Sequence, residues 1–111
     1  MIFNIKANIM KIVYSNNKIR KQIKKTAQSS RVLRKRIAQL MNAPCYLDIP
    51  TSTGKHFLKG NLKNYFAIYF GHPARLICEP IGEFKNKNGQ FIKETITAIE
   101  IIKIEKDYHQ K

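Results

Sequence analysis

The sequence predicts an α+β domain in which a two-helix hairpin packs on a mostly antiparallel sheet of four or five strands. Two stretches of helically spaced apolar residues follow a short β-rich segment near the start of the chain. After residue 55 the pattern changes to short runs rich in β-branched and aromatic residues, separated by turn residues. The length of 111 residues suits one domain with its own core, so we expect residues 1–111 to form a single domain.

The first expected strand covers residues 10–14, and Ser15-Asn16-Asn17 ends it. Met10 is a candidate start site, which would make residues 1–9 an N-terminal extension. A helix is expected over about residues 17–28, with Asn16 or Asn17 as its N-cap. The apolar residues of this helix recur every four positions: Ile19, Ile23 and Ala27.

A second helix is expected from Ser29 or Ser30, either of which can cap it, to about residue 42. Its apolar residues are expected to form one stripe: Val32, Leu33, Ile37, Leu40 and Met41. Two amphipathic helices joined by a tight turn need a sheet to cover their combined apolar face. Residues 43–54 hold two prolines and a Thr-Ser-Thr-Gly run, so we expect a loop over the surface.

Four further strands are expected, the last of which is the longest: residues 55–60, 63–70, 75–80 and 94–106. Gly60-Asn61 and residues 71–74 are read as turns, and residues 85–89 as a longer loop. Short turns between consecutive strands predict antiparallel neighbours.

The charge is strongly basic, with 21 Lys and Arg against 7 Asp and Glu and a formal net charge of +14. No acidic residue occurs between Met1 and Met41. Such a field attracts polyanions such as nucleic acid, a ribosome or an acidic protein, although a charged face can also serve solubility alone. The expected RNA contacts are Lys18, Lys21, Lys24, Lys25, Arg31, Arg34, Lys35 and Lys59.

Several classes of protein are disfavoured. No apolar run approaches the ~20 residues of a membrane span. Polar residues interrupt the first ten positions, which argues against a secretory signal. With Cys45 and Cys78 as its only cysteines, the chain is not expected to depend on a disulfide, and we expect a cytoplasmic protein without a membrane partner.

Metal and nucleophile motifs are also missing from the sequence. The histidines and cysteines show neither C-x-x-C nor H-x-x-x-H spacing, so no metal site is expected. No serine lies in a G-x-S-x-G elbow, and the glycines are isolated rather than gathered in a phosphate-binding loop. No cofactor is expected.

Polar groups remain at the ends of the expected strands: His56, Lys59, Arg75, Asp107, Tyr108 and His109. Cleavage of RNA by its own 2′-hydroxyl needs a base, an acid and a cation that stabilises the phosphate, and such residues supply all three. Each also has a plainer interpretation. His56 can be a histidine at a loop edge, Arg75 an ion-pair partner of Glu79 or Glu100, and Tyr108 an anchor at the edge of the core.

Three segments, "HFLKG", "YFAIYFGHPARLICEP" and "TAIEIIKIEKDYH", occur in this order in the second half of the chain. They resemble the HigB ("host inhibition of growth") toxins of the RelE/ParE superfamily, and the resemblance covers about residues 10–109. It implies a RelE-like fold and a type II toxin–antitoxin system, in which the toxin is an endoribonuclease that cuts messenger RNA on the translating ribosome.

By resemblance, the catalytic residues are His56, Asp107, Tyr108 and His109, and Arg75 is the phosphate-binding arginine; Lys59 accompanies them in the H-x-L-K-G motif. We interpret His109 as the proton-transfer group nearest the 2′-hydroxyl and His56 as the partner acid or a phosphate contact. Arg75 would stabilise the transition state, Asp107 would orient a histidine, and Tyr108 would stack on or position the base.

The implied partners are the 70S ribosome with its mRNA and a HigA-like antitoxin with a helix-turn-helix DNA-binding domain, through which alone the toxin would reach operator DNA. Two departures from the family pattern stand out: a short connection at Gln28-Ser29-Ser30, and Cys78 where phenylalanine is usual. Two alternatives remain open, a non-enzymatic ParE-like inhibitor of DNA gyrase and a plain basic RNA-binding module.

Overall fold

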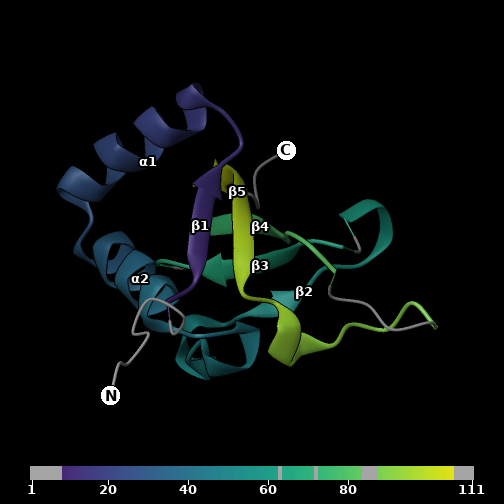
Figure 1. Ribbon diagram of the computed structural model, residues 1–111. Helices are drawn as coiled ribbons and strands as arrows, with labels where there is room; N and C mark the ends of the chain where they lie inside the picture. Colours follow the sequence, from purple (N-terminus) through teal and green to yellow (C-terminus); the bar gives the residue numbers. More distant parts are fainter. Residues whose placement is uncertain (1–8, 63, 72, 84–87, 107–111) are drawn as a thin grey trace, which may run out of the picture.

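The computed structural model describes residues 9–62, 64–71, 73–83 and 88–106 (Figure 1). The helices and strands follow one another as β1 (Lys11–Tyr14), α1 (Asn17–Ser29), α2 (Arg31–Asn42), β2 (His56–Phe57), β3 (Phe66–Tyr69), β4 (Arg75–Pro80) and β5 (Ala98–Glu105). The Asp107, Tyr108 and His109 positions of the predicted site lie outside the described residues.

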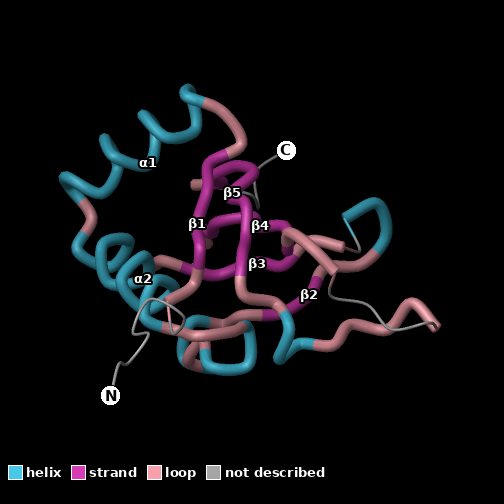
Figure 2. The backbone as a smooth tube through the Cα atoms, in the orientation of Figure 1, coloured by secondary structure: helices cyan, strands magenta, loops and turns pink. Residues whose placement is uncertain are grey.

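The strands form one five-stranded sheet in the order β1-β5-β4-β3-β2 (Figure 2). β2, β3, β4 and β5 pair with their neighbours in antiparallel fashion, and β1 runs parallel to β5 at one edge. The predicted α+β class, with an N-terminal strand, two helices and a mostly antiparallel sheet, is therefore confirmed.

Side-chain caps decide where the two helices begin. Asn16 Oδ1 accepts a hydrogen bond from the Ile19 backbone N–H at 2.9 Å, so Asn16 rather than Asn17 caps α1. Ser30 Oγ accepts one from the Leu33 N–H at 3.1 Å, so Ser30 rather than Ser29 caps α2. Ser30 also ends α1, and the helices are thus joined through this single residue.

Both helices lie on the same side of the sheet, and their apolar residues share one core with one of its faces (Figure 1). Leu33 and Leu40 of α2 are fully buried and Ile37 is partly buried, which follows the i, i+4, i+7 spacing of a helix face. The wider stripe that was expected is wrong at its margins. Val32 and Met41 are 39% and 48% exposed, because each lies about 100° around the helix from its buried neighbour.

The expected surface loop at residues 43–54 is wrong as well. The segment forms two short 3₁₀ turns, Tyr46–Asp48 and Thr51–Thr53. Ala43, Tyr46 and Ile49 are buried and belong to the core cluster, so this segment covers part of the core instead of only lying over the surface.

Four of the strands are shorter than expected, β1 by a single residue, while β4 has the expected bounds. β2 has only two residues, since the chain enters a 3₁₀ turn at Gly60–Leu62. β3 spans four residues. The start of the expected last strand is a 3₁₀ turn, Lys93–Thr95, although β5, with eight residues, is the longest strand described.

Candidate active site

The pairing of β2 to β5 aligns polar side chains in a row across the sheet. His56 is paired with Ala67, Tyr69 with Arg75, and Arg75 with Glu105. Directly paired residues share a face, as do residues two apart on one strand. His56, Tyr69, Arg75 and Glu105 therefore lie on one face, whereas Phe66, Ile68 and Leu76 point to the opposite face and join the core beneath the helices.

His56 is exposed, yet two contacts restrain its ring. Nδ1 lies 2.9 Å from the carbonyl oxygen of Gly54. The imidazole also stacks on the ring of Tyr69, with the ring centroids 5.9 Å apart and the planes 18° apart. A carbonyl oxygen only accepts hydrogen bonds, so Nδ1 is the protonated nitrogen in this contact, and in the neutral ring Nε2 carries the lone pair.

Gly54 fits beside this stack because it has no side chain. Its φ of +72° lies in the left-handed region. A Cβ at this position would lie 2.7 Å from Tyr69 Cδ2. Glycine is therefore required both by the backbone conformation and by the ring of Tyr69.

Arg75 is held by a carboxylate from the neighbouring strand. Its Nε donates to Glu105 Oε1 at 2.7 Å, and Lys103 Nζ lies 2.9 Å from Glu105 Oε2. Burial works to raise the pKa of Glu105, but the hydrogen bonds from Lys103 and Arg75 outweigh it and the pKa is lowered. Arg75 is thus an ion-pair partner, as the plainer interpretation proposed, although its partner is Glu105 rather than Glu79 or Glu100.

Of the remaining predicted site residues, the structure describes only Lys59. Lys59 is exposed in the segment between β2 and the turn at Gly60–Leu62. The chain reaches Asp107, Tyr108 and His109 directly after Lys106, the residue that follows Glu105. These three stay predictions because they lie outside the described residues.

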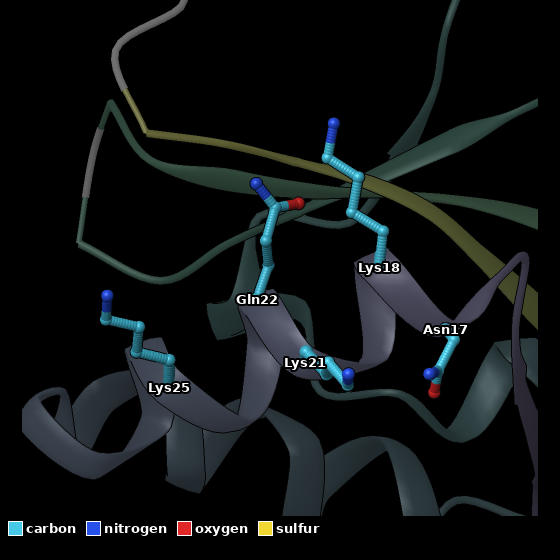
Figure 3. A pocket seen from close by; sticks show the side chains of 5 residues that line it. All are labelled: Asn17, Lys18, Lys21, Gln22 and Lys25. Atoms are coloured by element: carbon cyan, nitrogen blue, oxygen red, sulfur yellow. The ribbon is translucent and has the colours of Figure 1, made fainter.

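The predicted RNA contacts on the helices are all exposed, whereas Arg20 and Arg36 are partly buried. A hollow of about 450 Å³ on α1 is lined by Asn17, Lys18, Lys21, Gln22 and Lys25. In Figure 3, Lys18, Gln22 and Lys25 project from the helix to the same side. Three of the predicted RNA contacts, Lys18, Lys21 and Lys25, thus line the same hollow.

Arg34 has a structural contact besides its predicted contact with RNA. Its Nη1 donates to the carbonyl oxygens of Ala27 at 2.5 Å and Gln28 at 3.4 Å. These carbonyls belong to the last turn of α1, where backbone oxygens lack helical partners. Arg34 therefore helps to cap α1.

Sequence reasoning missed four residues around the site: Gly54, Tyr69, Glu105 and Arg36. The sequence indicates Tyr69 only as part of an expected strand and Gly54 only as part of an expected loop. Arg36 donates from Nε to the Tyr69 carbonyl oxygen at 2.7 Å and so ties α2 to the end of β3. The alternation of side chains along the strands is the signal that could have placed Tyr69 on the face of Arg75.

Within the described part of the chain, no group of three or more His, Cys, Asp or Glu side chains is arranged to hold a metal ion. Cys45 and Cys78 are free thiols. Among the same residues, no helix has the length and apolar character needed to cross a membrane.

Comparison of the chain with protein-family models, with curated proteins and with solved structures finds no match.

Proposed function

We propose that the protein is the toxin of a type II toxin–antitoxin system and cleaves messenger RNA on the translating ribosome. The observation that carries the proposal is the juxtaposition of His56, Tyr69 and Arg75 on the sheet face opposite the helices. A proton-transfer group and a fixed cation thus share one surface. β5 ends at Glu105, which lies on this surface, and Asp107, Tyr108 and His109 follow shortly afterwards in the sequence.

The reaction needs three groups and no metal ion. A base, His109 in this proposal, takes the proton of a 2′-hydroxyl, whose oxygen attacks the adjacent phosphorus in line. The bond from phosphorus to the 5′-oxygen breaks, and an acid, His56 in its imidazolium form, gives a proton to that oxygen and is left neutral. The products are a 2′,3′-cyclic phosphate and a 5′-hydroxyl end. Arg75 stabilises the extra negative charge of the transition state.

Asp107 and Tyr108 complete the proposal. Asp107 would hold the tautomer of a histidine, and Tyr108 would stack on the base next to the cleaved bond. Lys59, exposed three residues after His56, would contact a neighbouring phosphate.

The ion pair with Glu105 affects how Arg75 meets a phosphate. The pair uses the Nε–H, one of the five N–H donors of a guanidinium. Glu105 orients Arg75 but also offsets part of its charge, so RNA has to compete with this carboxylate. If the ribosome fixes the RNA geometry, the phosphate of ribosome-bound RNA displaces Glu105 from Arg75 more readily than the phosphate of free RNA does. Free RNA is then cut poorly.

The basic helices supply the binding energy in this proposal. Exposed lysines and arginines on α1 and α2 would contact ribosomal RNA during cleavage and an acidic segment of a HigA-like antitoxin in the inhibited state. Operator DNA would be reached only through the antitoxin. The protein would act in the cytoplasm, where its substrate is translated.

The test is 5′-end mapping of cellular RNA after brief induction, with growth followed in parallel. The wild type should produce new 5′-hydroxyl ends inside translated reading frames, and these should disappear when initiation is blocked. His109→Ala, His56→Ala and Arg75→Ala should abolish them. His72→Ala removes the histidine that has no role in the proposal and is the matched control, so it should leave the ends in place.

Growth arrest without new ends, equally strong in the His109→Ala variant, would overturn the nuclease proposal. DNA gyrase damage would then be measured, because a ParE-like inhibitor needs no catalytic histidine. Retained binding of RNA without cleavage or arrest would instead indicate a plain RNA-binding module.

A further inference from the structure

Tyr69 lies at the centre of the contacts that surround His56. Its ring stacks on the imidazole, and its Cδ2 fills the space beside Gly54. Its backbone oxygen accepts from Arg36 Nε, and its strand position is paired with Arg75. Tyr69 therefore connects His56 and Gly54 with α2, through Arg36, and with the neighbouring strand β4.

This arrangement is not required by the core. Ile68 and Phe70, on either side of Tyr69, are buried in the cluster beneath the helices. Tyr69 points to the other face and is only partly buried. The loss of its ring would thus remove contacts to Gly54 and His56 and leave the helix-covered core intact.

The two restraints on His56 select one form of its ring. An exposed histidine normally samples several rotamers and both neutral tautomers. Here the Gly54 carbonyl accepts from Nδ1, while the face of Tyr69 limits rotation of the ring. The proton is kept on Nδ1, and Nε2, on the side of the imidazole away from that bond, is left to exchange a proton.

We propose that Tyr69 is a positioning residue that holds His56 with its proton on Nδ1 and makes Nε2 the atom that exchanges a proton with RNA. The part that concerns RNA rests on the nuclease function proposed above. The part that concerns the histidine is a property of the free protein and needs no substrate.

Long-range proton–nitrogen NMR correlation distinguishes the two neutral tautomers. The spectrum of the free protein would be recorded at a pH where the imidazole is neutral, with the His56 signals assigned through His56→Ala. Wild type and Tyr69→Phe, which keeps the ring, should show mainly the Nδ1–H tautomer of His56. Tyr69→Leu should show a mixture dominated by Nε2–H, the form that free imidazole side chains favour.

Tyr65→Leu is the matched control, because it makes the same change at a partly exposed tyrosine just before β3. It should leave the His56 spectrum unchanged. Should Tyr69→Leu fail to fold, Gly54→Ala displaces the same ring, since its Cβ would lie 2.7 Å from Tyr69 Cδ2. The same change of tautomer is then expected.

On the ribosome, Tyr69→Leu should lower the cleavage rate about tenfold to a hundredfold, as loss of a supporting contact typically does, with substrate binding little changed. Tyr69→Phe should stay near the wild-type rate. A wild-type tautomer in Tyr69→Leu would overturn the proposal, as would undiminished cleavage by this variant where His56→Ala is inactive. If the wild type cuts no RNA, the nuclease function fails, and the spectra still decide whether Tyr69 holds His56.

Discussion

Arg75 and Glu105 are paired across β4 and β5, and their side chains meet with Nε and Oε1 2.7 Å apart. The side chains of Arg75 and Glu105 are only 14% and 20% exposed, so water screens the pair less than it screens a surface ion pair. Lys103 contacts the other carboxylate oxygen. One carboxylate thus ties two cations to the end of β5, two residues before Asp107 in the sequence.

Replacing Glu105 with glutamine should lower the free energy of unfolding by about 1 kcal/mol at neutral pH. The folded pKa of Glu105 is below the unfolded value of about 4.3, so its stabilising contribution is complete above the unfolded pKa. It is lost as the pH falls through the lower folded value. Denaturant unfolding of both proteins across this range should show their difference shrinking below about pH 4. The exposed Glu94→Gln is the control, and a difference for Glu105→Gln that is independent of pH would contradict the prediction.

Gly54→Ala should destabilise the protein more than Gly60→Ala. Both glycines have left-handed backbones, with φ of +72° and +70°, so either alanine costs about 1 kcal/mol or more in backbone strain. Only the Cβ at Gly54 would meet Tyr69, whereas nothing lies within 4 Å of one at Gly60. The free energies of unfolding measured in urea should differ between the two variants by at least about 1 kcal/mol, the usual cost of overpacking.

A double-mutant cycle isolates the contact between Gly54 and Tyr69. In a Tyr69→Leu background, Gly54→Ala should cost no more than Gly60→Ala, since the aromatic ring is gone. Equal costs of the two alanines in the wild-type background would mean that the ring gives way freely.

Ser30→Ala should lower the stability by about 1 kcal/mol, the typical value for a lost N-cap. Ser30 Oγ accepts from the Leu33 N–H at the start of α2, whereas Ser29 Oγ bonds to the Thr26 carbonyl oxygen in an exposed position. Ser29→Ala is therefore the matched control and should change the stability by only a few tenths of a kcal/mol. Thermal unfolding of both variants measures the difference. A larger effect of Ser29→Ala would mean that Ser30 is not the residue that caps α2.

Local signals in the sequence were sufficient for much of the fold. β4 has its expected bounds because a β-rich run lies between a Gly-His-Pro turn and Pro80. The helices follow from their apolar spacing. Residues 43–54 differ from the expectation because proline, serine and threonine are typical of loops. No local signal shows that Tyr46 and Ile49 of this segment cover part of the core.

The site was predicted less completely, for a different reason. His56 and Arg75 were found because their side chains carry chemistry. The partners that hold them, Tyr69 and Glu105, follow from strand register, which depends on the turns and on the irregularity at Ile77 and Cys78. Glu79 and Glu100 were the expected partners of Arg75, but they are paired with each other beyond that irregularity.

The hollow on α1 should contribute to polyanion binding beyond its share of net charge. Replacement of Lys18 and Lys25 by alanine removes two cations that line it, and Lys11 and Lys93, both exposed and off the helices, form the charge-matched control pair. Each phosphate contact on single-stranded RNA contributes about 0.7 to the dependence of log affinity on log salt concentration. Fluorescence anisotropy with a labelled single-stranded RNA should show the slope falling by roughly 1 for the hollow pair and by less than half of that for the control pair. Equal decreases in slope for the two double variants would contradict the prediction. They would mean that the RNA responds to the overall field of the protein, because long-range attraction depends on net charge and not on where the lysines lie.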